Sequence, residues 1–385
     1  MDLSQAVVAA KIWNTMLTFT LFLSGVFLVA VARRARNANN TYGAVSTAIS
    51  AILIFLFAFV NNVWGLFPGK DGSLEGGYPL NAFFIWWVGI ILAVYLGYTF
   101  KVWRKDQKEA RQHRDDQDAY WELFRNQDKN LYQADISVKM EGVRKAFHLA
   151  GLLLVASFYG LGFIGPVTAI VNNNALNHIY NVDPTGYMFL FGPQSLYSYF
   201  LNDPQANQDF TFFALLATLA FVLIPDIIRA NWATRYSLYN RLTGKVLRGK
   251  EYKAAGPQVY LIVGVCFSYL LYMRGAYPVN IPMAAALVAC FSDALAALLG
   301  RKWGKRQVKC PGGKIKTLEG FVAGVGSAYL ISLIFVGPIL ALVAAGVFFL
   351  LDYFPNPVAD NLSNPILISL ALWAVAAWGG VPIGW

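Results

Sequence analysis

An acidic residue inside a long apolar run is the first feature of this sequence that could do chemistry. Asp293 lies in the apolar run 281–299, six residues before its end. A charged side chain in a membrane costs ~2.5–3.5 kcal/mol on insertion scales, so it needs a compensating role. The neighbours of Asp293 on one helical face are all small, namely Ala289, Ala296, Ala297 and Gly300. Such a face permits close helix approach. We therefore expect a metal or proton site in a small cavity, or a structural acid paired with a lysine.

A basic, glycine-rich loop follows directly. Residues 301–316 hold seven Lys and Arg side chains in sixteen positions, and the next acid is Glu319. Cations and exposed backbone N–H groups bind polyphosphates, and glycines allow the tight turns that bring a backbone close to a ligand. The alternative is a cationic anchor on anionic lipid. Asp293 and Glu319 favour the phosphate site, because phosphoryl chemistry combines cations with carboxylates that hold Mg²⁺. The loop is not a Walker A motif, since no Ser or Thr follows Lys305.

More ionisable residues stand where other apolar runs begin or end. They are Arg144, Lys145 and His148 before and in the run 147–171, Asp226 and Arg229 at the end of 210–228, and Arg248, Lys250 and Glu251 before Pro257. Singly, such residues resemble snorkelling anchors. Together, we expect them to line one opening with the basic loop.

The composition predicts that membrane helices position these residues. Of the 385 residues, 57% are hydrophobic and only 14% charged, whereas soluble domains carry about 25% charged residues. The mean hydropathy is +0.47. We therefore expect an all-α, polytopic bundle. Ten apolar runs approach the ~20 residues that span a bilayer. They are 12–32, 43–66, 80–100, 147–171, 210–228, 257–273, 281–299, 320–336, 338–352 and 365–382. The three cysteines have no spacing typical of a disulfide or zinc site.

The distribution of cations predicts the orientation of this bundle. The loops after the first, third, fifth and seventh runs contain 28 of the 31 Lys and Arg residues. Cations accumulate in cytoplasmic loops, so we expect these loops in the cytoplasm and both termini outside. The protein would be a multi-pass component of the cell membrane or an endomembrane. The cations behind the net charge of +10 therefore lie mostly in these loops. We expect membrane lipids rather than nucleic acid as partners.

The segment FSDALAALLGRKWGKRQVKCPGGKIKTLEG resembles the signature of the CTP-dependent lipid kinases. This family includes dolichol and polyprenol kinases, phytol kinase and CTP-dependent diacylglycerol kinase. The matching residues are Asp293 and Ala296, then Gly300, Arg301, Gly304 and Lys305, then Lys316, Thr317, Glu319 and Gly320. The segments RKAFHLAG, PDIIRA and LRGKEYKAAGPQVYLIVG are also similar and in the same order. The resemblance covers about 141–335.

The resemblance implies transfer of the CTP γ-phosphate to a lipid hydroxyl at the cytoplasmic face, with Mg²⁺. Phosphoryl transfer depends largely on positioning and charge neutralisation. By this resemblance Asp293 would bind Mg²⁺ or activate the alcohol, with Glu319 and Asp226 as further candidates. His148 is a further implied catalytic residue. The residues implied to bind the nucleotide are Gly300, Arg301, Gly304, Lys305, Lys316, Thr317, Gly320, Arg144, Lys145, Arg229 and Arg248.

The substrate and the regions outside the resemblance stay open at this stage. An isoprenoid alcohol, such as polyprenol, dolichol, phytol or geranylgeraniol, is expected from resemblance alone. Diacylglycerol is the first alternative, a CDP-lipid synthase the second and an ion-coupled transporter the third. Four regions are expected, namely a three-helix membrane region at 1–104, a charged cytoplasmic segment at 105–140, a catalytic membrane domain at 141–336 and a two-helix membrane region at 337–385.

Overall fold

A computed structural model provides the architecture. It describes residues 3–67, 80–112, 121–122, 124, 128, 181–186, 204–239, 249–313 and 315–384. The predicted apolar run 147–171 lies outside these residues. The candidate site residues Arg144, Lys145, His148 and Arg248 lie outside them as well.

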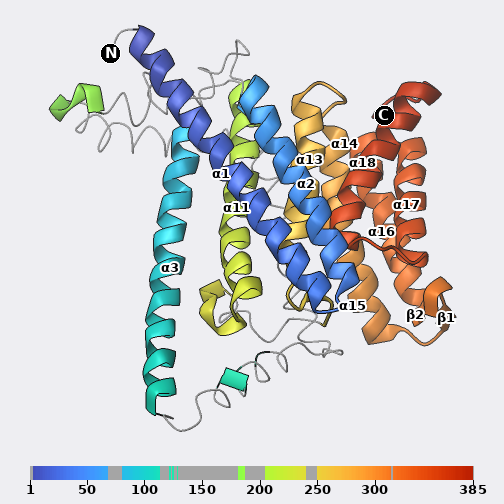
Figure 1. Ribbon diagram of the computed structural model, residues 1–385. Coiled ribbons are helices and arrows are strands. Elements are labelled where there is room, and N and C mark those ends of the chain that lie inside the picture. The colour runs from blue at the N-terminus through green and yellow to red at the C-terminus, as the bar shows by residue number, and fades with distance from the viewer. Residues whose placement is uncertain are drawn as a thin grey trace. The chain divides into compact units, whose positions relative to one another are not determined.

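The described chain is almost entirely helical (Figure 1). Its main helices are α1 Leu3–Asn37, α2 Thr41–Trp64, α3 Leu80–Gln112, α11 Pro204–Asn231, α13 Pro257–Met273, α14 Asn280–Leu287, α15 Asp293–Trp303, α16 Leu318–Val336, α17 Pro338–Tyr353 and α18 Asp360–Gly379. Among the described residues, seven spans are long and apolar enough to cross a membrane, α14 and α15 together forming one, while α13 and α17 are shorter. The all-α, polytopic prediction is confirmed.

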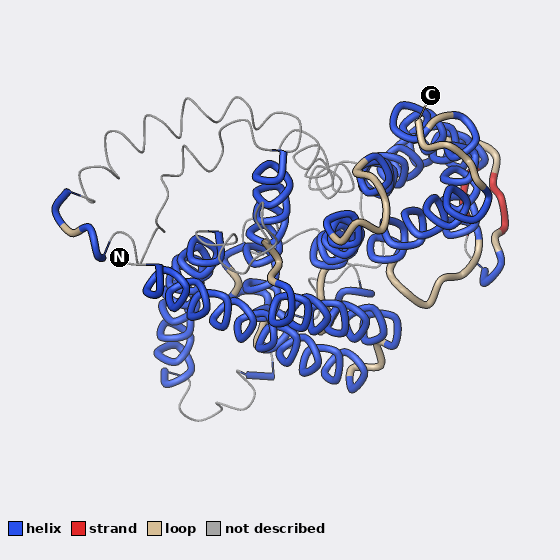
Figure 2. The backbone as a smooth tube through the Cα atoms, turned by 90° about the horizontal axis from the view of Figure 1, so that it is seen from above, coloured by secondary structure: helices blue, strands red, loops and turns tan. Residues whose placement is uncertain are grey.

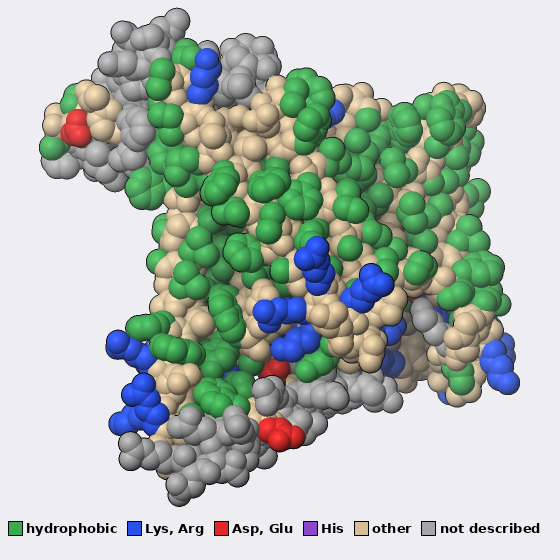
Figure 3. Space-filling model, viewed as in Figure 1, with side chains coloured by type: hydrophobic (Ala, Val, Ile, Leu, Met, Phe, Trp, Pro, Cys, Tyr) green, Lys and Arg blue, Asp and Glu red, His purple; other side chains and the backbone are tan. Residues whose placement is uncertain are grey.

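The surface agrees with a protein surrounded by lipid. Hydrophobic side chains cover much of the face drawn in Figure 3. On α16, Leu330 is 61% exposed and Ile334 is 71% exposed. A helix that is apolar on its outer side as well as its inner side is typical of membrane proteins.

The chain forms two compact units that are interleaved along the sequence. The first comprises Met1–Val26, Ala51–Ile91 and Leu152–Ala220, and the second comprises Phe27–Ser50, Leu92–Gly151 and Phe221–Trp385. Helices α1, α2, α3 and α11 therefore each contribute to both units. Every candidate site residue that the structure describes belongs to the second unit. The four regions predicted from the sequence stay a prediction.

In the first unit, reciprocal hydrogen bonds join α1 to α2. The Asn14 side-chain amide donates to the Asn61 carbonyl at 3.2 Å, and the Asn61 amide donates to the Asn14 carbonyl at 3.0 Å. Polar side chains that bond across helices in this way hold apolar helices in register.

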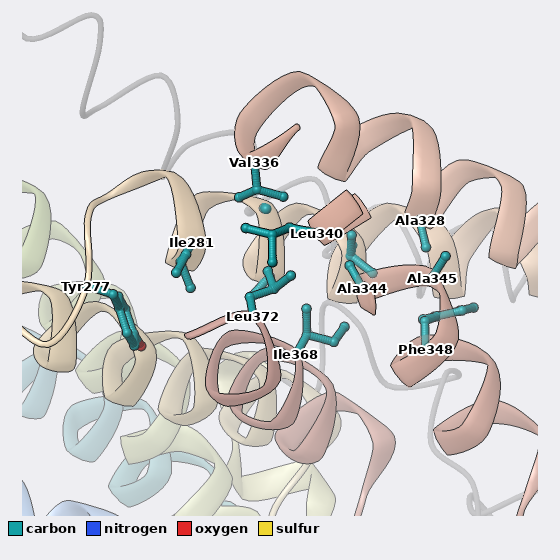
Figure 4. Packing of buried hydrophobic residues seen from close by; sticks show 13 residues of the cluster. Tyr277, Ile281, Ala328, Val336, Leu340, Ala344, Ala345, Phe348, Ile368 and Leu372 are labelled. Atoms are coloured by element: carbon teal, nitrogen blue, oxygen red, sulfur yellow. The ribbon is translucent and has the colours of Figure 1, made fainter. Parts of the chain in front are cut away.

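The buried core of the second unit combines alanines with larger apolar side chains. Helices α14, α16, α17 and α18 pack around Ala284, Ala328, Ala344, Phe348 and Ile368, which are all 1% exposed or less (Figure 4). Alanines at the contact allow apolar helices to approach closely. In lipid there is no hydrophobic force between helices, so these close dispersion contacts stabilise the packing instead. This core supports α15 and the loop that follows it.

A short β-hairpin connects α15 to α16 (red in Figure 2). Strand β1 Gln307–Lys309 pairs antiparallel with β2 Ile315–Thr317, and Val308 lies opposite Lys316. The connection contains Gly312 and Gly313 with φ of 79° and 80°. Residues with side chains rarely adopt this conformation, so glycine is needed here. The predicted basic loop is thus an ordered hairpin.

Candidate active site

Asp293 stands at a break in regular helix geometry. It is the first residue of α15 and follows a π-helical turn, Val288–Ser292, inside the span Asn280–Trp303. Single π-turns are frequent at functional sites because they loosen the regular hydrogen-bond ladder. The Asp293 side chain is partly exposed, whereas Ser292 is buried. The structure therefore places the predicted acid where a ligand can reach it.

The surroundings of Tyr42, near the start of α2, combine residues from distant parts of the sequence. The negative charges of Asp360, Asp293 and Glu251 all act on the Tyr42 hydroxyl, that of Asp360 most strongly. The ammonium of Lys250 lies 4.7 Å from the centre of the Tyr42 ring, within the range of a cation–π interaction. The segment around 250 thus contacts the start of α2.

The start of α2 holds its neighbours through hydrogen bonds. The Asn40 side-chain amide donates to the carbonyls of Lys250 and Tyr252 at 2.8 and 2.9 Å. The Ser46 hydroxyl accepts from the backbone N–H of Ala359 at 2.9 Å. These bonds fix the segment that carries Lys250 and Glu251, and they fix the start of α18. The beginning of α2 is therefore part of the scaffold of the site.

Asp226 and Arg229 form a buried ion pair. Both side chains are 1% exposed or less, and Arg229 Nε lies 2.7 Å from Asp226 Oδ1. Arg229 also donates to the carbonyls of Glu251 at 2.9 Å and Ala254 at 2.5 Å, and Asp226 Oδ2 accepts from the Gly256 N–H. This network ties the end of α11 to the segment 249–256. The geometry favours a positioning role for both residues over direct contact with a phosphate.

The glycines of the predicted signature bring α15 and α16 together. A Cβ added at Gly320 would lie 2.9 Å from the Ala296 carbonyl oxygen and 3.2 Å from Gly300 Cα. A Cβ at Gly304 would lie 2.4 Å from Cγ2 of Thr317, the N-cap residue of α16. Such short contacts have no space for a side chain. In the described structure these glycines therefore serve helix–helix approach, which brings the hairpin against the helix that carries Asp293.

We expect Gly320→Ala to destabilise the protein and Gly326→Ala on the same helix not to do so. The added methyl at 320 forces α15 and α16 apart, and overpacking of this kind costs ~1–3 kcal/mol. Nothing lies within 4 Å of a Cβ at Gly326, so that variant gains up to ~1 kcal/mol of helix propensity. Thermal unfolding of both variants in the same detergent measures the difference. Equal melting temperatures would contradict the close-packing role of Gly320.

Glu319 and Thr317 order the end of the hairpin. Thr317 is the N-cap of α16, and its hydroxyl accepts from the Gly320 N–H at 3.2 Å. Both carboxyl oxygens of Glu319 accept from the backbone N–H of Arg306 at 3.3 Å. A side-chain cap satisfies one of the free N–H groups at a helix start. Both residues therefore hold the loop in shape, and the metal role of Glu319 stays a prediction.

The cations of the loop differ in their surroundings. Arg301 and Lys305 are exposed. The Lys316 ammonium instead pairs with the Asp352 carboxylate and donates to the Asp352 carbonyl at 2.6 Å. A phosphate at Lys316 would therefore compete with Asp352. Sequence reasoning missed this pair, since Asp352 lies in a different helix, α17, and belongs to no motif.

The donors at the site suit Mg²⁺ only together with a nucleotide. Among the described residues, no three His, Cys, Asp or Glu side chains are arranged to hold a metal ion by themselves. Mg²⁺ prefers carboxylate oxygen, and it commonly takes one or two carboxylates together with substrate phosphates. Asp293, a partly exposed carboxylate, fits the role of such a single ligand.

Comparisons with known proteins find relatives among CTP-dependent lipid kinases. The chain is 33% identical over 109 residues to CTP-dependent diacylglycerol kinase 1 of Schizosaccharomyces pombe, covering 27% of this chain and 47% of the relative. It is 27% identical over 123 residues to CTP-dependent diacylglycerol kinase 1 of Saccharomyces cerevisiae, covering 32% and 40%. It is 28% identical over 134 residues to phytol kinase of Synechocystis, covering 32% and 57%.

The matches cover limited stretches of both proteins. The chain spans about half the length of these curated relatives. No family model matches it, and no solved structure does. The relatives nevertheless agree with the motif Asp293–Gly320 in pointing to one family. These similarities support the CTP-dependent lipid kinase family that the motif indicated.

Proposed function

We propose that this protein transfers the γ-phosphate of CTP to the hydroxyl of a membrane lipid. One observation carries the proposal. The basic hairpin 307–317 packs, through Gly300 and Gly320, directly on the helix that begins with Asp293. The cations that would bind phosphate and the Asp293 carboxylate thus belong to adjoining, packed elements, which supports the positioning that phosphoryl transfer requires. The relatives named as CTP-dependent kinases support the choice of donor.

In this proposal the basic segment 301–316 binds the triphosphate. Arg301 and Lys305 contact its oxygens, and Lys316 joins them if Asp352 releases it. Asp293 would hold Mg²⁺, which would supply charge neutralisation for the phosphates. The lipid oxygen attacks the γ-phosphorus while the bond to the β–γ bridging oxygen breaks. CDP leaves, and the alcohol proton passes to a carboxylate.

The proposed roles of the remaining residues follow from their surroundings. Asp293 serves as metal ligand or as the base for the alcohol. Asp226, Arg229 and Glu319 position the segments that line the site. Arg144, Lys145, His148 and Arg248 complete the site by family resemblance. The concentration of cations in alternate loops supports a site that faces the cytoplasm.

Phosphate labels in two positions test the reaction. We expect purified protein to move label into lipid from γ-labelled CTP and none from α-labelled CTP, with CDP as the by-product. A cytidylyltransferase would transfer the α-label and release pyrophosphate. A chain that transfers neither label to any lipid alcohol would overturn the enzyme assignment.

A panel of acceptors identifies the substrate class. The panel contains a polyprenol, phytol and diacylglycerol, with CTP and ATP as alternative donors. The relatives include kinases named for diacylglycerol and for phytol. We favour an isoprenoid alcohol, and mass analysis of the product decides. Preferred phosphorylation of diacylglycerol would contradict that choice while leaving the kinase assignment intact.

A further inference from the structure

An aromatic-lined cavity lies in the second unit, between residues 96–103 of α3 and the end of α11. Its volume is about 620 Å³, inside the ~300–1,000 Å³ range of small-molecule sites. The aromatic side chains that line it come from α3, from the described residues 121 and 124, and from the segment after α11. They are Phe100, Trp103, Trp121, Phe124, Trp232 and Tyr236. The cavity is therefore suited to a hydrocarbon ligand.

The polar residues of the lining are occupied by other contacts. The Thr99 hydroxyl bonds to the carbonyls of Tyr95 and Tyr236 at 2.8 and 2.9 Å. The Asn231 side-chain amide donates to the Ile227 carbonyl at 2.9 Å. Because these donors are occupied, the cavity presents mainly apolar surface. A lipid hydrocarbon chain is compatible with such a surface. A polar headgroup would lack hydrogen-bond partners inside the cavity.

One wall of the cavity is held rigidly. Arg235 forms an ion pair with the buried Asp106 of α3, and its guanidinium carbon lies 4.8 Å from the centre of the Phe124 ring. The backbone N–H of Thr234 donates to the Asp128 carboxylate at 2.8 Å. These contacts fix the segment Thr234–Tyr236 against α3. A preformed wall lowers the entropic cost of binding a flexible chain.

The cavity adjoins the segment that carries Glu251. The Lys253 ammonium donates to the Trp232 carbonyl at 3.3 Å, and Arg34 donates to the Asn231 carbonyl. Burial lowers the pKa of Lys253, and the positive charges of Arg34 and Arg229 lower it further, against the opposing effect of Asp128. Cations thus gather at this edge, and they are complementary to the phosphate that a lipid alcohol gains in the proposed reaction.

We propose that this cavity holds the hydrocarbon chain of the lipid acceptor, with the hydroxyl end directed toward the segment 249–256. The inference rests on the proposed kinase function. The acceptor is favoured over bulk membrane lipid because α11 connects the two places directly. It ends at the cavity with Asn231 and carries the Asp226–Arg229 pair that fixes the segment 249–256.

Photolabelling tests this binding without using enzyme activity. The full chain in lipid nanodiscs is exposed to phytol or diacylglycerol that carries a diazirine in its chain, and the labelled peptides are identified. We expect label on α3 near residues 96–103. A diazirine-bearing phosphatidylcholine serves as the bulk-lipid probe and should label there weakly. Equal labelling by all probes, or label confined to other helices, would overturn the proposal.

A filling variant with a matched control adds a second readout. Leu96→Trp fills the cavity, whereas Val94→Trp changes a residue on the same helix that does not line it. Both positions are about half exposed, at 47% and 53%. We expect Leu96→Trp to raise the KM for the lipid acceptor roughly 10–100-fold and leave the KM for CTP unchanged, since one misfitted group in an apolar pocket has effects of this size. Val94→Trp should match the unmodified chain.

The two readouts separate this proposal from the proposed function. Site-specific labelling of a chain that transfers no phosphate would overturn the kinase and leave the lipid site. An active kinase whose labelling and acceptor KM are unaffected by Leu96→Trp would overturn the lipid site alone. If Leu96→Trp does not fold, the peptide map of the unmodified chain decides the question.

Discussion

Asp293→Asn should lower the rate of γ-phosphate transfer by about 10³-fold or more. A carboxylate that holds a metal or accepts the alcohol proton contributes several kcal/mol to transition-state stabilisation, and ~4 kcal/mol corresponds to about 10³ in rate. The amide keeps the size of the side chain but not its charge. It is also less costly in a membrane than a carboxylate, so we expect the variant to fold. Initial rates with γ-labelled CTP and gel filtration in detergent measure both outcomes.

The control for Asp293 is a second Asp→Asn change at an exposed position. Asp183 is exposed and its carboxylate accepts from the Gly186 N–H at 3.0 Å. Asp183→Asn should keep the full rate. Excess Mn²⁺ should restore part of the rate of Asp293→Asn if Asp293 is a metal ligand, and none if it is the base. Wild-type turnover in Asp293→Asn would remove Asp293 from the mechanism.

Asp226→Ala should lower the free energy of unfolding by ~3–5 kcal/mol, because it leaves the buried Arg229 without its charge partner. The change also removes the acceptor of the Gly256 N–H. We expect poor recovery of folded protein and a strongly lowered melting temperature. Asp360→Ala, which changes a partly exposed acid near Tyr42, should affect the melting temperature far less.

The double variant Asp226→Ala, Arg229→Leu distinguishes positioning from catalysis. Removing both members of a buried ion pair restores much of the stability that removal of one member costs. If Asp226 only positions the segment 249–256, some activity returns with the fold. A double variant that is stable but fully inactive would instead support the catalytic role that the sequence suggested for Asp226.

The sequence alone determined the fold class and the first elements of the site. Hydropathy located membrane helices because a span must be apolar along its whole length, which is a local property. All predicted runs among the described residues are helical, including the short runs 257–273 and 338–352. The motif around Asp293 and Lys305 was also visible, because its residues lie close together in the sequence. It pointed to the family that the relatives support.

Only the tertiary structure decided which distant residues meet. Ser46 bonds to Ala359 across 313 positions, and Lys316 pairs with Asp352 across 36. Tyr42 and Asp360 carried no signal in the sequence, since each is an ordinary residue near the start of a helix. Such contacts depend on how apolar helices pack, and hydropathy predicts the length of a span but not its neighbours.

The same reason explains why the roles of predicted residues changed. In a sequence, a glycine is equally compatible with a ligand-binding turn and with a close helix contact. Only the atoms around its Cα in the folded structure distinguish these two roles. At Gly320 that space is filled by α15. An Asp followed three residues later by an Arg can likewise face a ligand or pair internally. Burial of both Asp226 and Arg229 selects the pair, because a buried charge requires its partner.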